Sequence, residues 1–150
     1  MKKKTVPFLI VLIIFLAVVA IEIVRFLPLN GKHRYICFFK DAISGRTIYE
    51  TRLLESVQGV DNIRLFAEEL LLGPFSHKAK RIFPGECHVE FCFLRDGVLY
   101  LSLSPGILPR SPNSGENLNE SLKLYEKNLR RNFRNIRQVK FFCNNEEIKR

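Results

Sequence analysis

The sequence predicts an α+β domain in which a mixed β-sheet carries two helices on one face, preceded by one transmembrane helix. Three observations predict this fold class. An uncharged run, residues 6–21, follows three N-terminal lysines; two later stretches carry apolar residues at helical spacing; and five stretches are rich in aromatic and β-branched residues. After the first helix the order is strand, strand, helix, strand, strand, helix, strand, which suits helices packed on one face of a sheet.

The chain has 150 residues, enough for one domain and one extra segment. With 47% hydrophobic and 26% charged residues, it can form a packed core, and a disordered chain is excluded. We expect residues 1–29 to form a cytoplasmic tip and a membrane anchor, and residues 30–150 to form the domain. That domain holds 20 basic and 14 acidic residues, and the resulting net charge of +6 favours anionic partners.

The first segment has the charged start and apolar run shared by secretory signals and signal anchors. Residues 6–24 contain a single charge, Glu22, and these 19 residues approach the roughly 20 that a membrane span needs. Ala20 suits a cleavage site, yet apolar residues continue to Leu29, which favours an uncleaved anchor over a cleaved signal. The lysines predict a single-pass protein of the bacterial cytoplasmic membrane, with its N-terminus inside and its domain extracytoplasmic.

The first half of the domain is predicted to be a hairpin followed by a helix. Residues 34–40 form a strand with Tyr35, Cys37 and Phe39 toward the core, and residues 46–54 return beside it. Asp61 or Asn62 caps a helix that ends at Gly73-Pro74. The apolar face of this helix consists of Ile63, Phe66, Ala67, Leu70 and Leu71.

The second half repeats this order of elements. Residues 87–95 alternate, which predicts Val89, Phe91 and Phe93 toward the core, and Asp96-Gly97 turns the chain into a strand over residues 98–103. A Pro-rich loop follows, then a helix over residues 119–133 and a last strand over residues 138–143. The apolar stripe of the second helix consists of Leu118, Leu122, Tyr125, Leu129 and Phe133.

Several motifs follow one another through the domain. They are Leu70-Leu71-Leu72-Gly73-Pro74, Ile82-Phe83-Pro84-Gly85, Asp96-Gly97-Val98 leading into Leu101-Ser102-Leu103-Ser104, and the final strand from Ile136 to Phe141. Taken in this order, they resemble the GerM domain of sporulation and germination proteins over nearly all of residues 34–150. The residues that carry the resemblance are Leu71, Leu72, Gly73, Pro74, Pro84, Gly85 and Gly97.

The resemblance implies an extracytoplasmic, membrane-anchored α+β domain, related to ring-building motifs, that assembles an envelope complex and has no known catalytic activity. Two features depart from the family pattern. Asn144-Asn145-Glu146-Glu147 stands where the family has a turn with glycine, and one copy of the domain fits where the namesake carries two. Assembly into a ring is therefore an open question, whereas the fold is not.

Neither the cysteines nor the histidines form a chemical motif, so we expect no metal, no cofactor and no catalytic residue. Strand parity places Cys37, Cys87 and Cys143 toward the core and Cys92 away from it. The inward three can pack as free thiols or include one disulfide, and both arrangements stay open.

Two surfaces are candidate interfaces. The first is a basic cluster, Arg130, Arg131, Arg134, Arg137 and Lys140, which is either a solvated face at a helix C-terminus or a docking patch for an anionic partner. The second is the uncovered sheet face, where strand parity gathers Ile36, Phe38, Leu94 and Phe142. The linker or the Pro-rich loop can equally cover this second surface.

The sequence therefore favours a non-catalytic interaction or assembly module in a bacterial envelope complex of sporulation or germination type. The alternative is a module that binds cell-wall polymer or anionic lipid through the basic cluster. Expected partners are the membrane and other envelope proteins, with homo-oligomers left open. Nucleic acid is not expected, because the domain is predicted to lie outside the cytoplasm.

Overall fold

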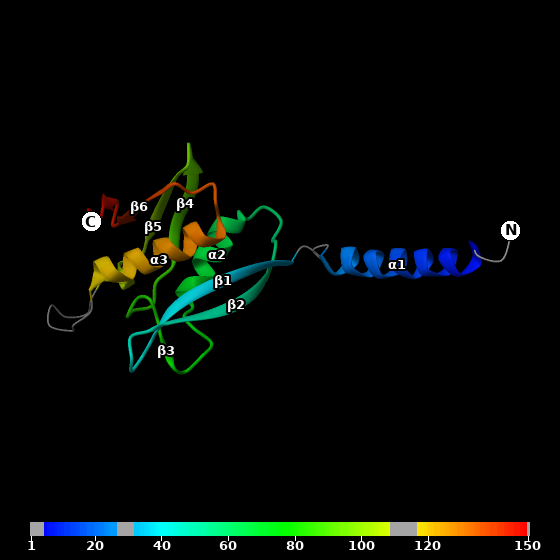
Figure 1. The fold of residues 1–150 in the computed structure, drawn as a ribbon. Helices are drawn as coiled ribbons and strands as arrows, with labels where there is room; N and C mark the ends of the chain where they lie inside the picture. The colour runs from blue at the N-terminus through cyan, green and yellow to red at the C-terminus, as the bar shows by residue number, and fades with distance from the viewer. Residues whose placement is uncertain (1–4, 27–31, 109–116, 150) are drawn as a thin grey trace.

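The computed structural model describes residues 5–26, 32–108 and 117–149, with side chains of the first helix described from Ile10 to Ile21. The strands are β1 (Lys32–Asp41), β2 (Thr47–Glu55), β3 (Ala79–Lys80), β4 (Val89–Arg95), β5 (Val98–Leu103), β6 (Gln138–Cys143) and β7 (Glu146–Glu147). The helices are α1 (Thr5–Phe26), α2 (Asn62–Leu71), α3 (Leu118–Asn132) and a short 3-10 turn, η2 (Pro105–Ile107). Figure 1 shows their arrangement.

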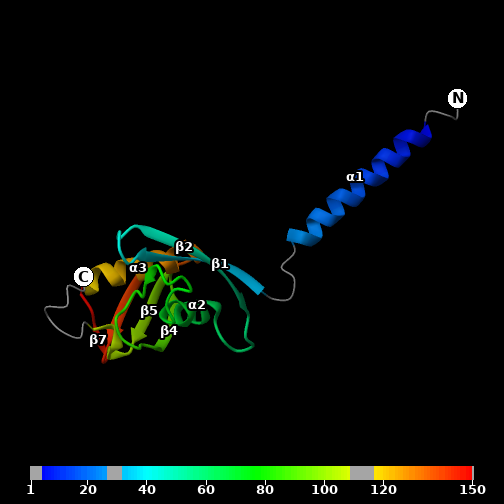
Figure 2. The same cartoon turned by 90° about the horizontal axis from the view of Figure 1, so that it is seen from below.

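The strands form two sheets, which corrects the prediction of a single one. Their orders are β2-β1-β3 and β4-β5-β6-β7, and the second sheet is mixed because β5 and β6 run parallel. Figure 2 shows the β1–β2 ribbon apart from β4 and β5. The physical reason lies at the edge of β1 that faces away from β2. The short β3 pairs only with the end of β1, and α3 occupies the rest of that edge.

The predicted transmembrane helix is a second correction. Helix α1 has exposed apolar side chains where they are described. Among the residues that the structure describes, however, no helix combines the length and apolar character needed to cross a bilayer. The α+β class therefore stands, and the transmembrane helix does not.

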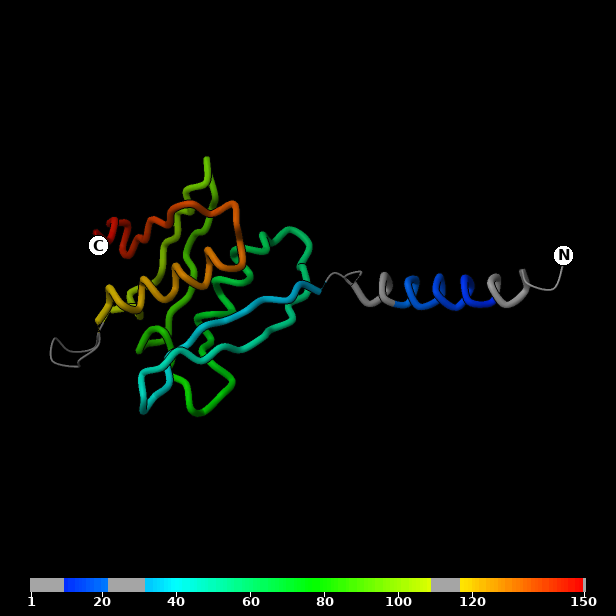
Figure 3. The backbone as a smooth tube through the Cα atoms, viewed as in Figure 1, coloured from blue at the N-terminus to red at the C-terminus, as the bar shows by residue number. Residues whose placement is uncertain are grey.

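Helix α3 closes the edge of β1 with two asparagine side chains. The Asn128 amide accepts from the Phe38 backbone N–H at 2.6 Å and donates to the Phe38 carbonyl at 2.9 Å. Asn132 makes the same pair of bonds to Ile36, at 2.9 and 2.8 Å. Each amide thus offers the donor and the acceptor that a neighbouring strand would offer. In Figure 3 the tube of α3 runs alongside β1 before the chain turns back into β6.

Strand β4 differs from the prediction in which of its side chains point inward. Its pairing with β5 shifts register between Val89 and Phe91, so Val89 is buried while Phe93 is 48% exposed. Cys92 and Leu94 instead pack against the core. A bulge inserts one extra residue and therefore reverses the faces beyond it. The inward residues predicted for β1, Tyr35, Cys37 and Phe39, are confirmed as buried, and so is Cys143 of β6.

One buried cation ties the first sheet to the end of α2. The Arg52 side chain, on β2, lies 2.7 Å from the Glu69 carboxylate and 3.4 Å from that of Glu50. It also donates to the Gly73 carbonyl, and its guanidinium lies 4.1 Å from the centre of the Phe75 ring. With Arg52 only 3% exposed, this cluster fixes the loop after α2 against β2.

Candidate functional site

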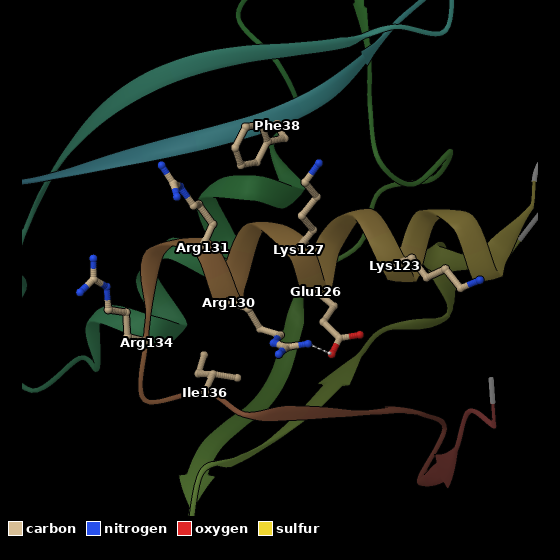
Figure 4. Close-up of a pocket in the computed structure, with 8 residues that line it drawn as sticks. All are labelled: Phe38, Lys123, Glu126, Lys127, Arg130, Arg131, Arg134 and Ile136. Atoms are coloured by element: carbon tan, nitrogen blue, oxygen red, sulfur yellow. Dashed lines mark ion pairs between the residues drawn. The ribbon is translucent and has the colours of Figure 1, made fainter.

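Helix α3 carries the candidate site, a groove of about 680 Å³ along its solvent side that we call the basic groove. Figure 4 shows the side chains around it. It is lined by Phe38 of β1, by Ile136 before β6, and by Lys123, Glu126, Lys127, Arg130, Arg131 and Arg134 from α3 and the turn that follows.

The position of the groove follows from how α3 is held. Asn117 caps the helix by accepting from the backbone N–H groups of Asn119 and Glu120, and Leu122, Tyr125 and Leu129 are fully buried on its inner face. With one face fixed to the core and to β1, the remaining face is left to solvent and carries the charges.

The cations line both sides of the helix. Lys123, Lys127 and Arg131 follow one another at intervals of four, which places them in one row along α3. The Lys127 ammonium lies 5.0 Å from the centre of the Phe38 ring. Figure 4 shows Arg130 on the other side, toward Ile136, where its guanidinium lies 3.7 Å from the Glu126 carboxylate.

The groove is strongly electropositive. Of its described lining residues, five carry positive charge and only Glu126 carries negative charge. Guanidinium groups bind carboxylate and phosphate oxygens in pairs, and lysines add mobile donors. Phe38 and Ile136 contribute apolar surface beside them. This combination suits an extended anion with some apolar character.

The structure brings together only part of the predicted basic cluster. Arg130, Arg131 and Arg134 line the groove, but Arg137, directly before β6, and Lys140, within β6, do not. Arg137 lies against Gly97 in the β4–β5 turn, and its backbone N–H donates to the Gly97 carbonyl at 2.8 Å. Lys140 pairs with Glu147 of β7 at 3.4 Å.

Sequence reasoning missed two of the five cations that line the groove, Lys123 and Lys127. Their signal was present, because they precede Arg131 by eight and four residues on a helix that was predicted. The prediction grouped basic residues that are close together in the sequence and did not include those four residues apart on the helix. The predicted patch therefore extended past the end of the helix.

The predicted apolar face is divided between the two sheets. Ile36 and Phe38 are half-buried on the first sheet, beside α3. Phe142 belongs to the second, where its ring lies 5.8 Å from Phe91 and 6.5 Å from Tyr100. Phe93 stacks on Tyr100 at 4.7 Å and completes a group of four rings on the outer face of that sheet.

The motif residues lie at turns and close backbone approaches. Leu71 is buried, Leu72 is exposed, and Gly73-Pro74 follows them, with Gly73 at a φ of 93°. Gly85, after Pro84, faces the η2 turn so closely that an added Cβ would lie 2.5 Å from the Gly106 carbonyl oxygen. Asp96 and Gly97 have φ angles of 51° and 79° in the β4–β5 hairpin, as the Asp-Gly signal predicted.

The last turn, between β6 and β7, forms without the glycine that is typical of the family. Asn144 and Asn145, at φ angles of 52° and 64°, lead β6 into β7. Asparagine tolerates this left-handed backbone better than other non-glycine residues, so the turn forms without glycine.

The cysteines and Ser102 do not form a nucleophilic site. All four cysteines are free thiols. Burial raises the pKa of Cys37 to about 11 and that of Cys92 to about 12, so both stay protonated at neutral pH. The Ser102 hydroxyl donates to Glu90 at 2.6 Å rather than to a histidine. Across the described ranges, no three His, Cys, Asp or Glu side chains are grouped to hold a metal ion.

Comparison with known proteins identifies the fold. No family model and no curated protein matches the sequence. The tandem GerMN domains of the sporulation protein GerM from Bacillus subtilis align over 79% of this chain and 41% of theirs, with 16% identity and a TM-score of 0.62. The first GerMN domain of that protein aligns over 78% of this chain and 86% of its own, with 16% identity and a TM-score of 0.59.

The chain thus spans less than half of the tandem structure and most of a single domain. The resemblance to the GerM domain that the motifs predicted is confirmed as a shared fold.

Proposed function

We propose that the chain is a non-catalytic interaction module that helps to assemble a sporulation-type complex in the bacterial cell envelope. Its fold supports this role, because the GerMN domains that share it belong to a protein named for sporulation. A fold alone hosts many functions, so the argument rests on the surface. The basic groove carries it: five cations beside two apolar side chains fit an acidic segment of a partner protein.

The N-terminal sequence supports action outside the cytoplasm. Lys2, Lys3 and Lys4 followed by an apolar run are typical of exported proteins. An envelope partner would then meet the groove on that side of the membrane.

A photo-crosslinking amino acid in place of Lys127 tests the interaction in intact cells of the native organism. We expect an adduct of defined mass with a second protein, because Lys127 lines the groove beside Phe38. The same amino acid in place of Arg46, which is exposed before β2 and does not line the groove, is the control. Adducts from neither position, or the same adducts from both, would contradict the proposal.

The groove also favours a second candidate function, the binding of an anionic wall polymer or lipid surface. Reversing Arg130, Arg131 and Arg134 to glutamate should weaken binding to teichoic acid or to phosphatidylglycerol vesicles by at least about 100-fold, because the three lost cations alone contribute roughly 1 kcal/mol each near an anionic surface. Co-sedimentation at fixed ionic strength measures the change.

The matched control reverses Arg46, Lys78 and Arg95, which are exposed on other elements. It changes the net charge equally. Equal losses in both triple variants would mean that only overall charge matters, and unchanged binding in the groove variant would remove this candidate.

A further inference from the structure

Strand β2 is an open edge of the first sheet. The strand order β2-β1-β3 leaves one side of β2 unpaired within the described part of the chain. Tyr49 and Leu53, on the outer face of the strand, are 73% and 65% exposed. Thr51 lies between them and is exposed as well.

The backbone of β2 is oriented to pair with another strand. Ile36 and Phe38 turn their N–H and C=O groups toward α3, so the alternate residues of β1, such as Cys37, turn theirs toward β2. Cys37 stands opposite Glu50, which places the backbone groups of Glu50 toward β1 and those of Thr51 toward the open edge. Tyr49 and Leu53 share the orientation of Thr51, since alternate residues face the same way.

Three of the usual protections of an edge strand are missing from β2. Natural edges often carry proline, lysine or a bulge that prevents pairing with another chain. Strand β2 has neither proline nor lysine, and its register with β1 is continuous from Thr47 to Glu55. Its one inward-pointing cation, Arg52, is paired within the chain with Glu50 and Glu69.

The strand is also complementary to itself. Thr51 is its central residue, so an antiparallel copy related by a two-fold axis at Thr51 would pair all nine residues. Tyr49 would then face Leu53 of the second copy, and Leu53 would face its Tyr49. Aromatic residues opposite aliphatic ones stabilise antiparallel pairs. On the inner face, Glu50 would stand opposite Arg52 of the second copy, so no like charges would face each other, while each Arg52 keeps Glu50 and Glu69 of its own chain.

We propose that β2 pairs antiparallel with β2 of a second copy of this chain, about a two-fold axis at Thr51. The two three-stranded sheets then join into one sheet of six strands. This inference rests on the proposed assembly role and names a second copy as one of its partners. It leaves the basic groove open, because the groove lies on α3, at the opposite edge of β1.

A cysteine in place of Thr51, in the full chain, tests this pairing. Directly opposed residues of a hydrogen-bonded antiparallel pair lie about 5.5 Å apart between Cα atoms, within the range that a disulfide spans. We expect a disulfide-linked dimer to be the main product on mild oxidation, and a short bis-maleimide to give the same dimer. Circular dichroism should match the parent, since the Thr51 side chain is exposed.

Position 49 supplies the matched control. In the proposed dimer the two copies of Tyr49 are four residues apart along the strands, about 13 Å, so Tyr49→Cys alone should not link. A mixture of Tyr49→Cys and Leu53→Cys chains should link as a heterodimer. Equal linking at every position, or none at Thr51→Cys, would overturn the proposal.

The unmodified chain, with its four native cysteines, sets the background. The two proposals fail separately. Loss of the Thr51 link with the Lys127 adduct retained would leave the assembly role standing and remove self-pairing. The reverse result would retain self-pairing and remove the envelope partner.

Discussion

Replacing Arg52 by methionine should lower the free energy of unfolding by about 3 to 5 kcal/mol, the usual cost of removing one partner from a buried ion pair. The change removes the cation that pairs with the carboxylates of both Glu50 and Glu69. It also removes the bond to the Gly73 carbonyl and the contact with the Phe75 ring, which hold the loop after α2. Urea denaturation followed by circular dichroism measures the loss.

The matched control is Arg64→Met on α2. Arg64 also pairs with a glutamate, Glu68, at 2.9 Å, but both side chains are more than 40% exposed. An exposed pair of this kind contributes about 0.3 to 0.5 kcal/mol. If both variants lost the same small amount, the Arg52 cluster would not be holding the loop after α2 in place.

The surroundings of Glu50 explain why it stays charged in this cluster. Burial alone would raise its pKa, yet the pKa lies below its usual value because the backbone N–H groups of Phe75 and Ser76 and the Arg52 guanidinium stabilise the carboxylate. Arg52→Met removes one of these three sources of stabilisation.

Local signals in the sequence predicted most of the elements. The cap at Asp61 and the apolar spacing of Ile63, Phe66 and Leu70 predicted α2, and Asp96-Gly97 predicted the β4–β5 hairpin. The residues of each signal lie within a few positions of one another, so such elements can be predicted from a short stretch of sequence. The two-residue strands β3 and β7 were missed because so short a stretch has no periodicity to detect.

Features that depend on distant contacts could not be read in the same way. The β4 bulge depends on how β4 meets β5, and it reversed the predicted faces of Phe91 and Cys92. The division into two sheets depends on asparagines of α3, 96 and 90 residues after their partners in β1. An asparagine inside a helical pattern only lowers helix propensity, so its role as an edge partner leaves no mark in the sequence.

The candidate site was predicted only in part, because some of its residues are close together in the sequence and others meet only in the fold. Arg130, Arg131 and Arg134 were identified by their concentration, because charge density is a local property. Their separation from Arg137 and Lys140 depends on where the chain leaves α3 and enters β6. Phe38 joins the groove only because α3 lies along β1, which again follows from the asparagine contacts.

Replacing Asn128 by alanine should therefore cost about 2 to 4 kcal/mol. Two backbone groups of Phe38 lose their partner, at roughly 1 to 3 kcal/mol for each unpaired buried group, and the half-buried position of Phe38 favours the lower part of that range. Asn128 is fully buried, and the methyl group of alanine can form neither of the two hydrogen bonds. Urea denaturation gives the magnitude. Amide hydrogen exchange gives the location, because the Phe38 N–H should lose its protection first.

The control is Asn119→Ala, in the exposed first turn of the same helix, where most surface changes stay within about 0.5 kcal/mol. The variant Asn128→Asp separates the donor role of the amide from its acceptor role. An ionised aspartate can accept from the Phe38 N–H but faces the carbonyls of Phe38 and Leu124 without a proton to donate. Its folded-state pKa should therefore rise above the unfolded value of about 3.9.

The sign of the pH effect follows from that shift. Because the folded state holds the proton more tightly, the Asp variant should gain stability relative to the parent as pH falls through the raised pKa toward about 4, where the neutral acid can donate again. The Ala variant should show no such recovery. A loss at Asn128→Ala no larger than at Asn119→Ala would mean that packing of α3, rather than its amides, keeps β1 from joining the second sheet.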